Sequence, residues 1–81
     1  MDDSIENLPD EPLIRQTIAG DANSFTVLVV RYQDRLYNSM VHFLRNTTEA
    51  EDVVQDAFVL ALTRLDSFKG NSQFYTWLYR I

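Results

Sequence analysis

The chain has no cysteine, a single histidine, and only two glycines and two prolines among its 81 residues. The absence of cysteine excludes disulfide bonds and thiolate chemistry, and it fits a reducing compartment. The longest apolar run, Phe25 to Val30, is far shorter than the roughly 20 residues that span a membrane. The N-terminus also lacks the basic and apolar blocks of a signal peptide. We therefore expect a soluble, cytoplasmic protein with no membrane partner.

The chain also lacks an excess of positive charge: its net charge is −5 and its pI is about 4.5. This balance argues against broad, nonspecific binding to duplex DNA. The acids are concentrated in residues 1–12, which contain no base, whereas residues 64–81 contain three bases and one acid. The C-terminal end therefore still allows a local nucleic-acid site.

Residues 1–9 are acidic and show no apolar period, which predicts a flexible tail before one helical domain over residues 10–81. A first helix is expected from about Asp10 to Ala19, with Asp10 as its N-cap and Gly20 as its stop signal. Its predicted buried stripe consists of Leu13, Ile14 and Ile18.

A long second helix is expected from about Ala22 to Arg45, capped by Asp21, because apolar residues recur at spacings of three and four. Its predicted core positions are Phe25, Leu28, Val29, Tyr32, Leu36, Met40, Phe43 and Leu44. A third helix is expected to end near Leu65 and to begin with a capping box formed by Thr48 and Glu51. Its predicted core face contains Ala50, Val53, Val54, Ala57, Phe58, Ala61 and Leu65.

A loop over residues 66–71 should follow, because Gly70 permits a positive φ. Ser72 is the predicted cap of a fourth helix, which the end of the chain cuts short. The predicted fold class is therefore all-α: a small helical bundle of three complete helices plus a truncated fourth.

Catalytic groups are scarce. His42 has no acid at helical spacing, so a surface position is favoured over a catalytic base. The carboxylates around the start of the third helix also suit the positive end of the helix dipole. Metal sites in bundles draw Glu-x-x-His ligands from facing helices, and no such partner is present. We expect no enzyme activity, no metal site and no cofactor.

The outward face of the third helix combines acidic, polar and apolar side chains. Its members are Asp52, Gln55, Asp56 and Val59. An apolar centre with a charged rim is typical of a docking patch, but a single exposed valine is also ordinary on any surface. The spacing alone leaves both readings open, and a docking partner would be basic, such as an arginine-rich helix.

Five of the ten aromatic residues lie between Phe68 and Tyr79. Aromatic rings next to basic groups can bind unpaired bases, since every base has a π-face and every phosphate a charge. Aromatic residues at helical spacing are also common in cores. A stacking platform and a plain core are both open at this point.

Five segments of the chain, in this order and spacing, carry a specific resemblance. They are LIRQTIAGD, SFTVLVVRYQDRLY, AEDVVQDAF, LDSFKG and FYTWLYRI. From about Asp10 to the end, the sequence resembles region 2 of bacterial RNA polymerase sigma factors of the extracytoplasmic-function (ECF) type.

The resemblance implies two partners. The third helix would bind core RNA polymerase at the β′ clamp helices, through Asp52, Gln55, Asp56 and the neighbouring Val59. The loop and fourth helix would recognise and melt the −10 promoter element by capturing its non-template strand. The DNA-binding residues would be Phe68, Lys69, Asn71, Ser72, Tyr75, Thr76, Trp77 and Arg80.

Two departures from the family bear on these expectations. The chain stops at Ile81, inside the promoter-recognition helix, and the second family domain, a helix-turn-helix that reads the −35 element, is absent. These departures predict a fragment with weak promoter affinity. An exposed apolar strip of Trp77, Leu78 and Ile81 is expected to favour self-association.

An anti-sigma factor is a further candidate partner. The alternative is a small helical protein–protein interaction or regulatory module with no nucleic-acid role.

Overall fold

The computed structural model describes residues 4–81, and all regular secondary structure in this part of the chain is helical. Its elements are η1 (Ile5–Asn7), α1 (Asp10–Ile18), α2 (Ala22–Leu44), α3 (Thr47–Thr63), η2 (Leu65–Ser67) and α4 (Phe74–Arg80). The predicted all-α class is confirmed. None of the helices in these residues is long and apolar enough to cross a membrane.

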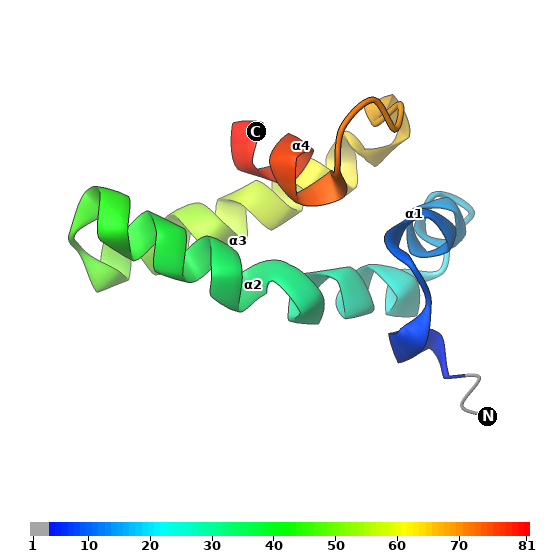
Figure 1. The fold of residues 1–81 in the computed structure, drawn as a ribbon, viewed down its shortest axis with the longest axis horizontal. Helices are drawn as coiled ribbons and strands as arrows, with labels where there is room; N and C mark the ends of the chain where they lie inside the picture. The colour runs from blue at the N-terminus through cyan, green and yellow to red at the C-terminus, as the bar shows by residue number, and fades with distance from the viewer. Residues whose placement is uncertain (1–3) are drawn as a thin grey trace.

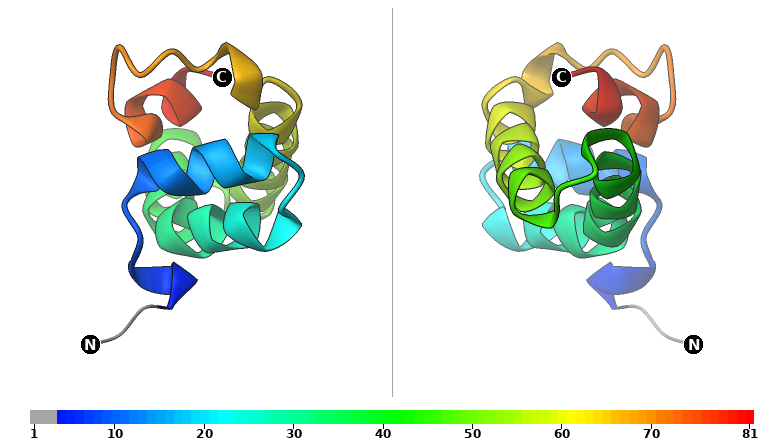
Figure 2. Two further views of the ribbon diagram at one scale, coloured as in Figure 1. Left: turned by 90° about the vertical axis from the view of Figure 1, so that its right-hand side faces the viewer. Right: turned by 90° about the vertical axis from the view of Figure 1, so that its left-hand side faces the viewer.

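The long helices α2 and α3 form an antiparallel pair, and the short helices pack onto this pair (Figure 1). Helix α1 crosses the N-terminal part of α2 and reaches η2, while α4 packs against α3 (Figure 2). The loop over residues 68–73 therefore comes to lie opposite α1, although the two are far apart in the sequence.

One apolar core joins all four α-helices and η2. Its buried members are Leu13, Ile14, Leu28, Leu36, Val54, Phe58, Ala61, Leu65, Phe74 and Leu78. Phe74 and Leu78 are only 2% and 1% exposed, so α4 is anchored by one face. Burial of a leucine or phenylalanine side chain contributes roughly 1.5–3 kcal/mol, and this anchor fixes which residues α4 presents to solvent.

The start of α1 differs from the prediction. Pro9 is the N-cap, and Asp10 is the first helical residue. The Asp10 carboxylate is bound by α2 instead, as described below.

The buried stripe of α1 also differs from the prediction, because Ile18 is 53% exposed and Thr17 is buried in its place. The Thr17 hydroxyl can be buried because it donates to the Leu13 carbonyl and needs no solvent.

The start of α2 agrees with the prediction, since the Asp21 side chain accepts a hydrogen bond from the Asn23 N–H at 3.0 Å. The end of α2 does not, because Phe43 is 74% exposed rather than buried. Periodicity identifies which face a residue occupies but not how far the neighbouring helices extend over it. Phe43 lies in the last turn of α2, beyond their cover.

The predicted capping box of α3 is wrong. Arg45 adopts a left-handed conformation with φ 56°, and Asn46 caps the helix by accepting from the Glu49 N–H at 3.0 Å. Because α3 already begins at Thr47, Thr48 lies inside its first turn. Val53, predicted to be in the core, is 40% exposed.

The end of α3 and the start of α4 also differ from expectation. Helix α3 ends at Thr63, and Leu65 is buried from the following 3₁₀ turn. Gln73, not Ser72, is the N-cap of α4, with no side-chain cap bond. The expected positive φ of Gly70 is confirmed at 76°.

Burial of Leu78 overturns part of the predicted apolar strip. Trp77 and Ile81 are partly exposed, but Leu78 points into the core. The predicted tail also includes a short helix. Ile5–Asn7 form η1, and Ile5 and Leu8 pack against the core. The acids of residues 1–3 in that prediction lie outside the described residues.

Candidate nucleic-acid and polymerase interfaces

A network of aromatic rings connects the loop and α4 to α2. The centroid distances are 5.4 Å for Phe68–Trp77, 6.0 Å for Phe68–Phe74, 5.8 Å for Phe74–Trp77, 5.6 Å for Tyr32–Phe74, 5.9 Å for Tyr32–Tyr75 and 6.2 Å for Tyr75–Tyr79. Such ring pairs contribute about 0.5–1.5 kcal/mol beyond their burial. Phe68 and Trp77 therefore hold the loop on α4 while leaving part of each ring exposed.

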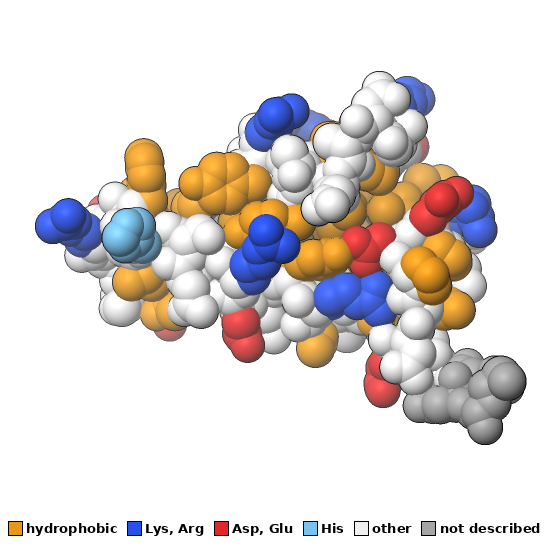
Figure 3. Space-filling view, viewed as in Figure 1, with side chains coloured by type: hydrophobic (Ala, Val, Ile, Leu, Met, Phe, Trp, Pro, Cys, Tyr) orange, Lys and Arg blue, Asp and Glu red, His pale blue; other side chains and the backbone are white. Residues whose placement is uncertain are grey.

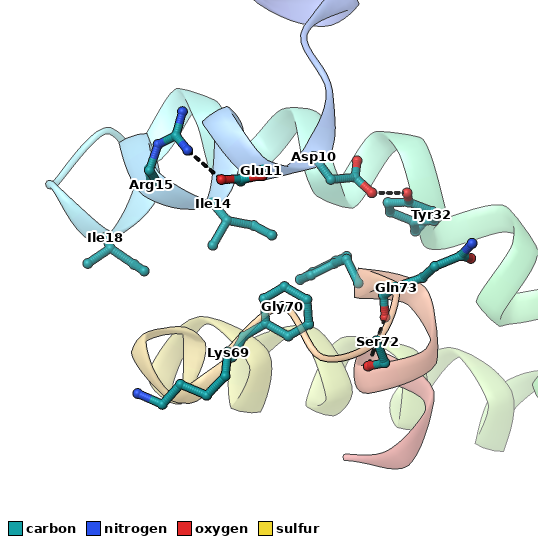
Figure 4. Close-up of a pocket in the computed structure, with 12 residues that line it drawn as sticks. Asp10, Glu11, Ile14, Arg15, Ile18, Tyr32, Lys69, Gly70, Ser72 and Gln73 are labelled. Carbon is teal, nitrogen blue, oxygen red and sulfur yellow. Dashed lines mark hydrogen bonds and ion pairs between the residues drawn. The ribbon is translucent and has the colours of Figure 1, made fainter.

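A cleft of about 660 Å³ lies between α1 and the loop over residues 68–73 (Figure 4). It is lined by Asp10, Glu11, Ile14, Arg15, Ile18, Tyr32, Phe68, Lys69, Gly70, Ser72, Gln73 and Phe74. Its size is within the range of small-molecule pockets, roughly 300–1,000 Å³. Its lining combines apolar and polar groups, which suits a flat, polar-edged ligand such as a nucleobase.

The structure brings three of the four predicted loop residues to this cleft: Phe68, Lys69 and Ser72. Asn71 is exposed and is not part of its lining. The sequence did not predict that α1 forms one side of the cleft, here called the α1 wall, through Asp10, Glu11, Ile14, Arg15 and Ile18. No motif places α1 beside the loop, because that contact depends on how α1 crosses the bundle.

The α1 wall is held in place by Asp10. Its carboxylate accepts a hydrogen bond from Arg31 at 2.7 Å and another from the Tyr32 hydroxyl. Arg31 also donates to the Glu6 carbonyl at 2.9 Å, which ties η1 to the same point. Burial, together with the hydrogen bond and negative charge of Asp10, raises the pKa of Tyr32 to about 12. The Tyr32 hydroxyl therefore stays protonated, and able to donate to Asp10, up to a higher pH than an ordinary tyrosine.

A second groove of about 450 Å³ lies between α2 and α4. It is lined by Arg35, Ser39, Tyr75, Thr76, Tyr79 and Arg80. Three of the predicted DNA-binding residues meet here: Tyr75, Thr76 and Arg80. The groove also contains Arg35 from α2, which the sequence reading did not select.

The predicted docking face of α3 is exposed. Asp52, Gln55 and Asp56 all lie at the surface, and Val59 is 65% exposed. Within residues 4–81, none of their side chains makes a hydrogen bond or an ion pair. Leu62, one turn beyond Val59, is 50% exposed. The face thus combines free acidic groups with an apolar strip.

Residues 4–81 contain no group of three His, Asp or Glu side chains able to hold a metal ion. His42 is exposed, as expected for a surface histidine.

Fold and surfaces together define a small helical binding domain with one acidic face and one aromatic, basic face. Residues 28–81 match the Sigma-70 region 2 family. The chain belongs to this family, and the predicted membership of the ECF group is confirmed.

Its relatives include named sigma factors. The chain is 43% identical over 72 residues to RNA polymerase sigma-H factor of Pseudomonas aeruginosa, covering 89% of this chain and 37% of that protein. It is 45% identical over 76 residues to ECF RNA polymerase sigma-E factor of Escherichia coli K12, covering 94% and 39%. The chain spans about two fifths of the length of these curated relatives.

A solved structure is also similar. An engineered region 2 of sigmaE, determined by NMR in complex with GTAAAA, matches with a TM-score of 0.82 and 39% identity. The match covers 99% of this chain and 80% of that one.

Proposed function

We propose that this chain is a transcription initiation factor domain that docks on core RNA polymerase through α3 and captures the −10 promoter element. The observation that carries the proposal is the cleft between α1 and the loop over residues 68–73, beside partly exposed aromatic rings. Support comes from the similar region 2 whose structure contains GTAAAA. A partner such as core polymerase would place the protein in the cytoplasm.

Strand capture would need no bond chemistry. A base that leaves the helix loses stacking and pairing worth a few kcal/mol. Stacking on protein aromatic rings contributes about 1–3 kcal/mol per base, which is enough to offset that loss. In this proposal the cleft takes one unpaired base of the non-template strand, and Lys69 adds a charge near its backbone.

Polymerase docking would use the exposed face of α3. Within residues 4–81 the carboxylates of Asp52 and Asp56 have no partners, and Val59 offers an apolar contact. A basic coiled coil such as the β′ clamp helices complements both, because arginine forms strong hydrogen bonds with carboxylates. Complementary charge also accelerates association.

The docking face is tested by reversing its charge. The double variant Asp52→Lys/Asp56→Lys should weaken binding to a β′ clamp-helix fragment by at least tenfold, as expected for about 1.4 kcal/mol or more. The matched control is Asp66→Lys, an exposed acid in η2, which should bind normally. Equal binding by all three proteins would refute the assignment of this face.

The strand site is tested with single strands that contain GTAAAA and lack one base at a time. A captured base predicts one position where removal weakens binding sharply, with smaller effects elsewhere. A uniform, small effect at every position would exclude a base pocket and leave only backbone attraction.

An anti-sigma partner and self-association stay predictions. The basis for self-association is reduced, because Leu78, the middle of the expected apolar strip, is buried.

A further inference from the structure

The groove between α2 and α4 is separate from the cleft, since the two share no lining residue. It lies on the α2 side of α4, where Arg35 and Ser39 of α2 face Tyr75, Thr76, Tyr79 and Arg80 of α4. Figure 3 shows apolar side chains gathered on the face that carries α2 and α4, with basic side chains around them.

The charge of this groove is entirely positive. Its lining contains two guanidinium groups and no carboxylate. The ion pairs within residues 4–81 engage Arg15 and Arg31, and neither Arg35 nor Arg80 takes part in one. The adjacent acid, Asp34, lines a different pocket. Two arginines without anionic partners therefore converge on one groove.

Arg35 is positioned before any ligand arrives. Its Cζ lies 3.8 Å from the centroid of the Tyr75 ring, so the ring holds the guanidinium by a cation–π contact. The hydroxyl groups of Ser39 and Tyr75 are 3.2 Å apart, which fixes the ring in turn. A guanidinium held in this way loses little entropy when its N–H groups bind a phosphate or carboxylate.

A row of aromatic rings connects the cleft to the groove between α2 and α4. Tyr32, which lines the cleft, contacts Tyr75 at 5.9 Å between centroids, and Tyr75 contacts Tyr79 at 6.2 Å. Tyr79 is 49% exposed and offers a further stacking surface. A strand with one base in the cleft can therefore reach the groove along a continuous aromatic path.

We infer that Arg35 and Arg80 together bind a backbone phosphate of the single DNA strand whose base occupies the cleft. The inference rests on the proposed function for the identity of the strand. It assigns Arg35, on the otherwise structural helix α2, a direct role in holding that strand. The positive charge of the groove selects the backbone rather than a particular base.

The test replaces one charged phosphate at a time with an uncharged methylphosphonate, in a single strand that contains GTAAAA. Binding is measured by fluorescence anisotropy at low salt. For the unmodified protein, one position should weaken binding about tenfold, the size expected for a charge-assisted contact. For the double variant Arg35→Gln/Arg80→Gln, replacement at that position should cost nothing further, and for each single variant it should cost less than in the unmodified protein.

Salt dependence gives a second readout. The slope of log K against log salt is negative, and each lost phosphate contact makes it shallower by about 0.7 for a single strand. The double variant Arg35→Gln/Arg80→Gln should show this reduction, each single variant should show a smaller one, and Arg35→Lys should retain the slope but lose affinity. The control is Arg45→Asn, which removes one charge at the far end of α2 and keeps a residue that tolerates a left-handed backbone. It should behave like the unmodified protein.

The outcomes separate the two proposals. If the unmodified protein binds no single strand, the proposed function fails and this inference fails with it. If it binds but the arginine variants show the same methylphosphonate profile and salt slope, only this inference is overturned. Because Arg35→Gln also removes the contact with Tyr75, the exposed Arg80 provides the variant that leaves the fold intact.

Discussion

Two ion pairs near the cleft have almost the same length but different exposure. Arg31 and Asp10 are 2.7 Å apart, with side chains 26% and 27% exposed. Arg15 and Glu11 are 2.6 Å apart, with side chains 65% and 81% exposed. Both acids lie in the first turn of α1, so both have the same favourable interaction with the helix dipole. A comparison of Asp10→Ala with Glu11→Ala therefore isolates how burial changes the contribution of an ion pair to stability.

The expected magnitudes differ several-fold. Asp10→Ala leaves the Tyr32 hydroxyl without its acceptor and removes one of the two acceptors of Arg31. Loss of a hydrogen bond to a charged group costs about 1.5–3 kcal/mol, and breaking a fully buried pair costs about 3–5. Because water still reaches about a quarter of each side chain, we expect about 2–3 kcal/mol. Glu11→Ala should cost about 0.5 kcal/mol or less.

The assay is thermal unfolding followed by circular dichroism at pH 7. In a domain of this size, 1 kcal/mol shifts Tm by about 4–8 °C. Asp10→Ala should therefore lower Tm by about 8–24 °C, and Glu11→Ala by less than about 4 °C. In a Tyr32→Phe background, Asp10→Ala should cost less, because one of its partners is already gone. Equal, small shifts for both variants would refute the claim that Asp10 holds the α1 wall.

The remaining predictions concern Tyr32 and the start of α3. Because the pKa of Tyr32 is raised from 10.0 to about 12, its contribution to stability is complete below pH 10 and is lost as the pH rises towards 12. The difference in unfolding free energy between the unmodified protein and Tyr32→Phe should shrink over that range, and a constant difference would contradict this. Asn46→Ala should lower the unfolding free energy by about 1 kcal/mol, because it removes the cap of α3, whereas Thr48→Ala should be nearly neutral. Both values are measured by chemical denaturation. A larger loss for Thr48→Ala than for Asn46→Ala would show that the capping box forms after all.

The number and order of helices could be predicted because the apolar period is long and the breakers are few. Gly20 and Gly70 both have a positive φ, as their positions suggested. The exposed face of α3 was also predictable, since outward orientation follows from the helical period once the buried side is known. Asp52, Asp56 and Val59 accordingly lie at the surface.

The cap of α2, Asp21, was predictable, but the cap of α3 was not, because two side chains of equal capability lie close together there. Asn46 and Thr48 are both good N-cap residues, and the left-handed turn at Arg45 decides between them. The exposure of Ile18 and Phe43 depends on where neighbouring helices end, and the helical period contains no such information.

The groove between α2 and α4 lies beyond what the sequence can show. The contact between Arg35 and Tyr75 joins residues 40 positions apart, and it exists only because Phe74 and Leu78 anchor α4 beside α2. The α1 wall of the cleft has the same origin, since Asp10 is fixed by Arg31 and not by any local signal.

The central claim is that the chain has two separate surfaces, α3 for polymerase and the loop with α4 for DNA. The most direct test measures the anisotropy of a labelled single strand containing GTAAAA, bound to the chain, as a β′ clamp-helix fragment is added. Two separate surfaces predict that the strand stays bound and the anisotropy rises, because a larger ternary complex forms. Release of the strand with a falling anisotropy would contradict the claim.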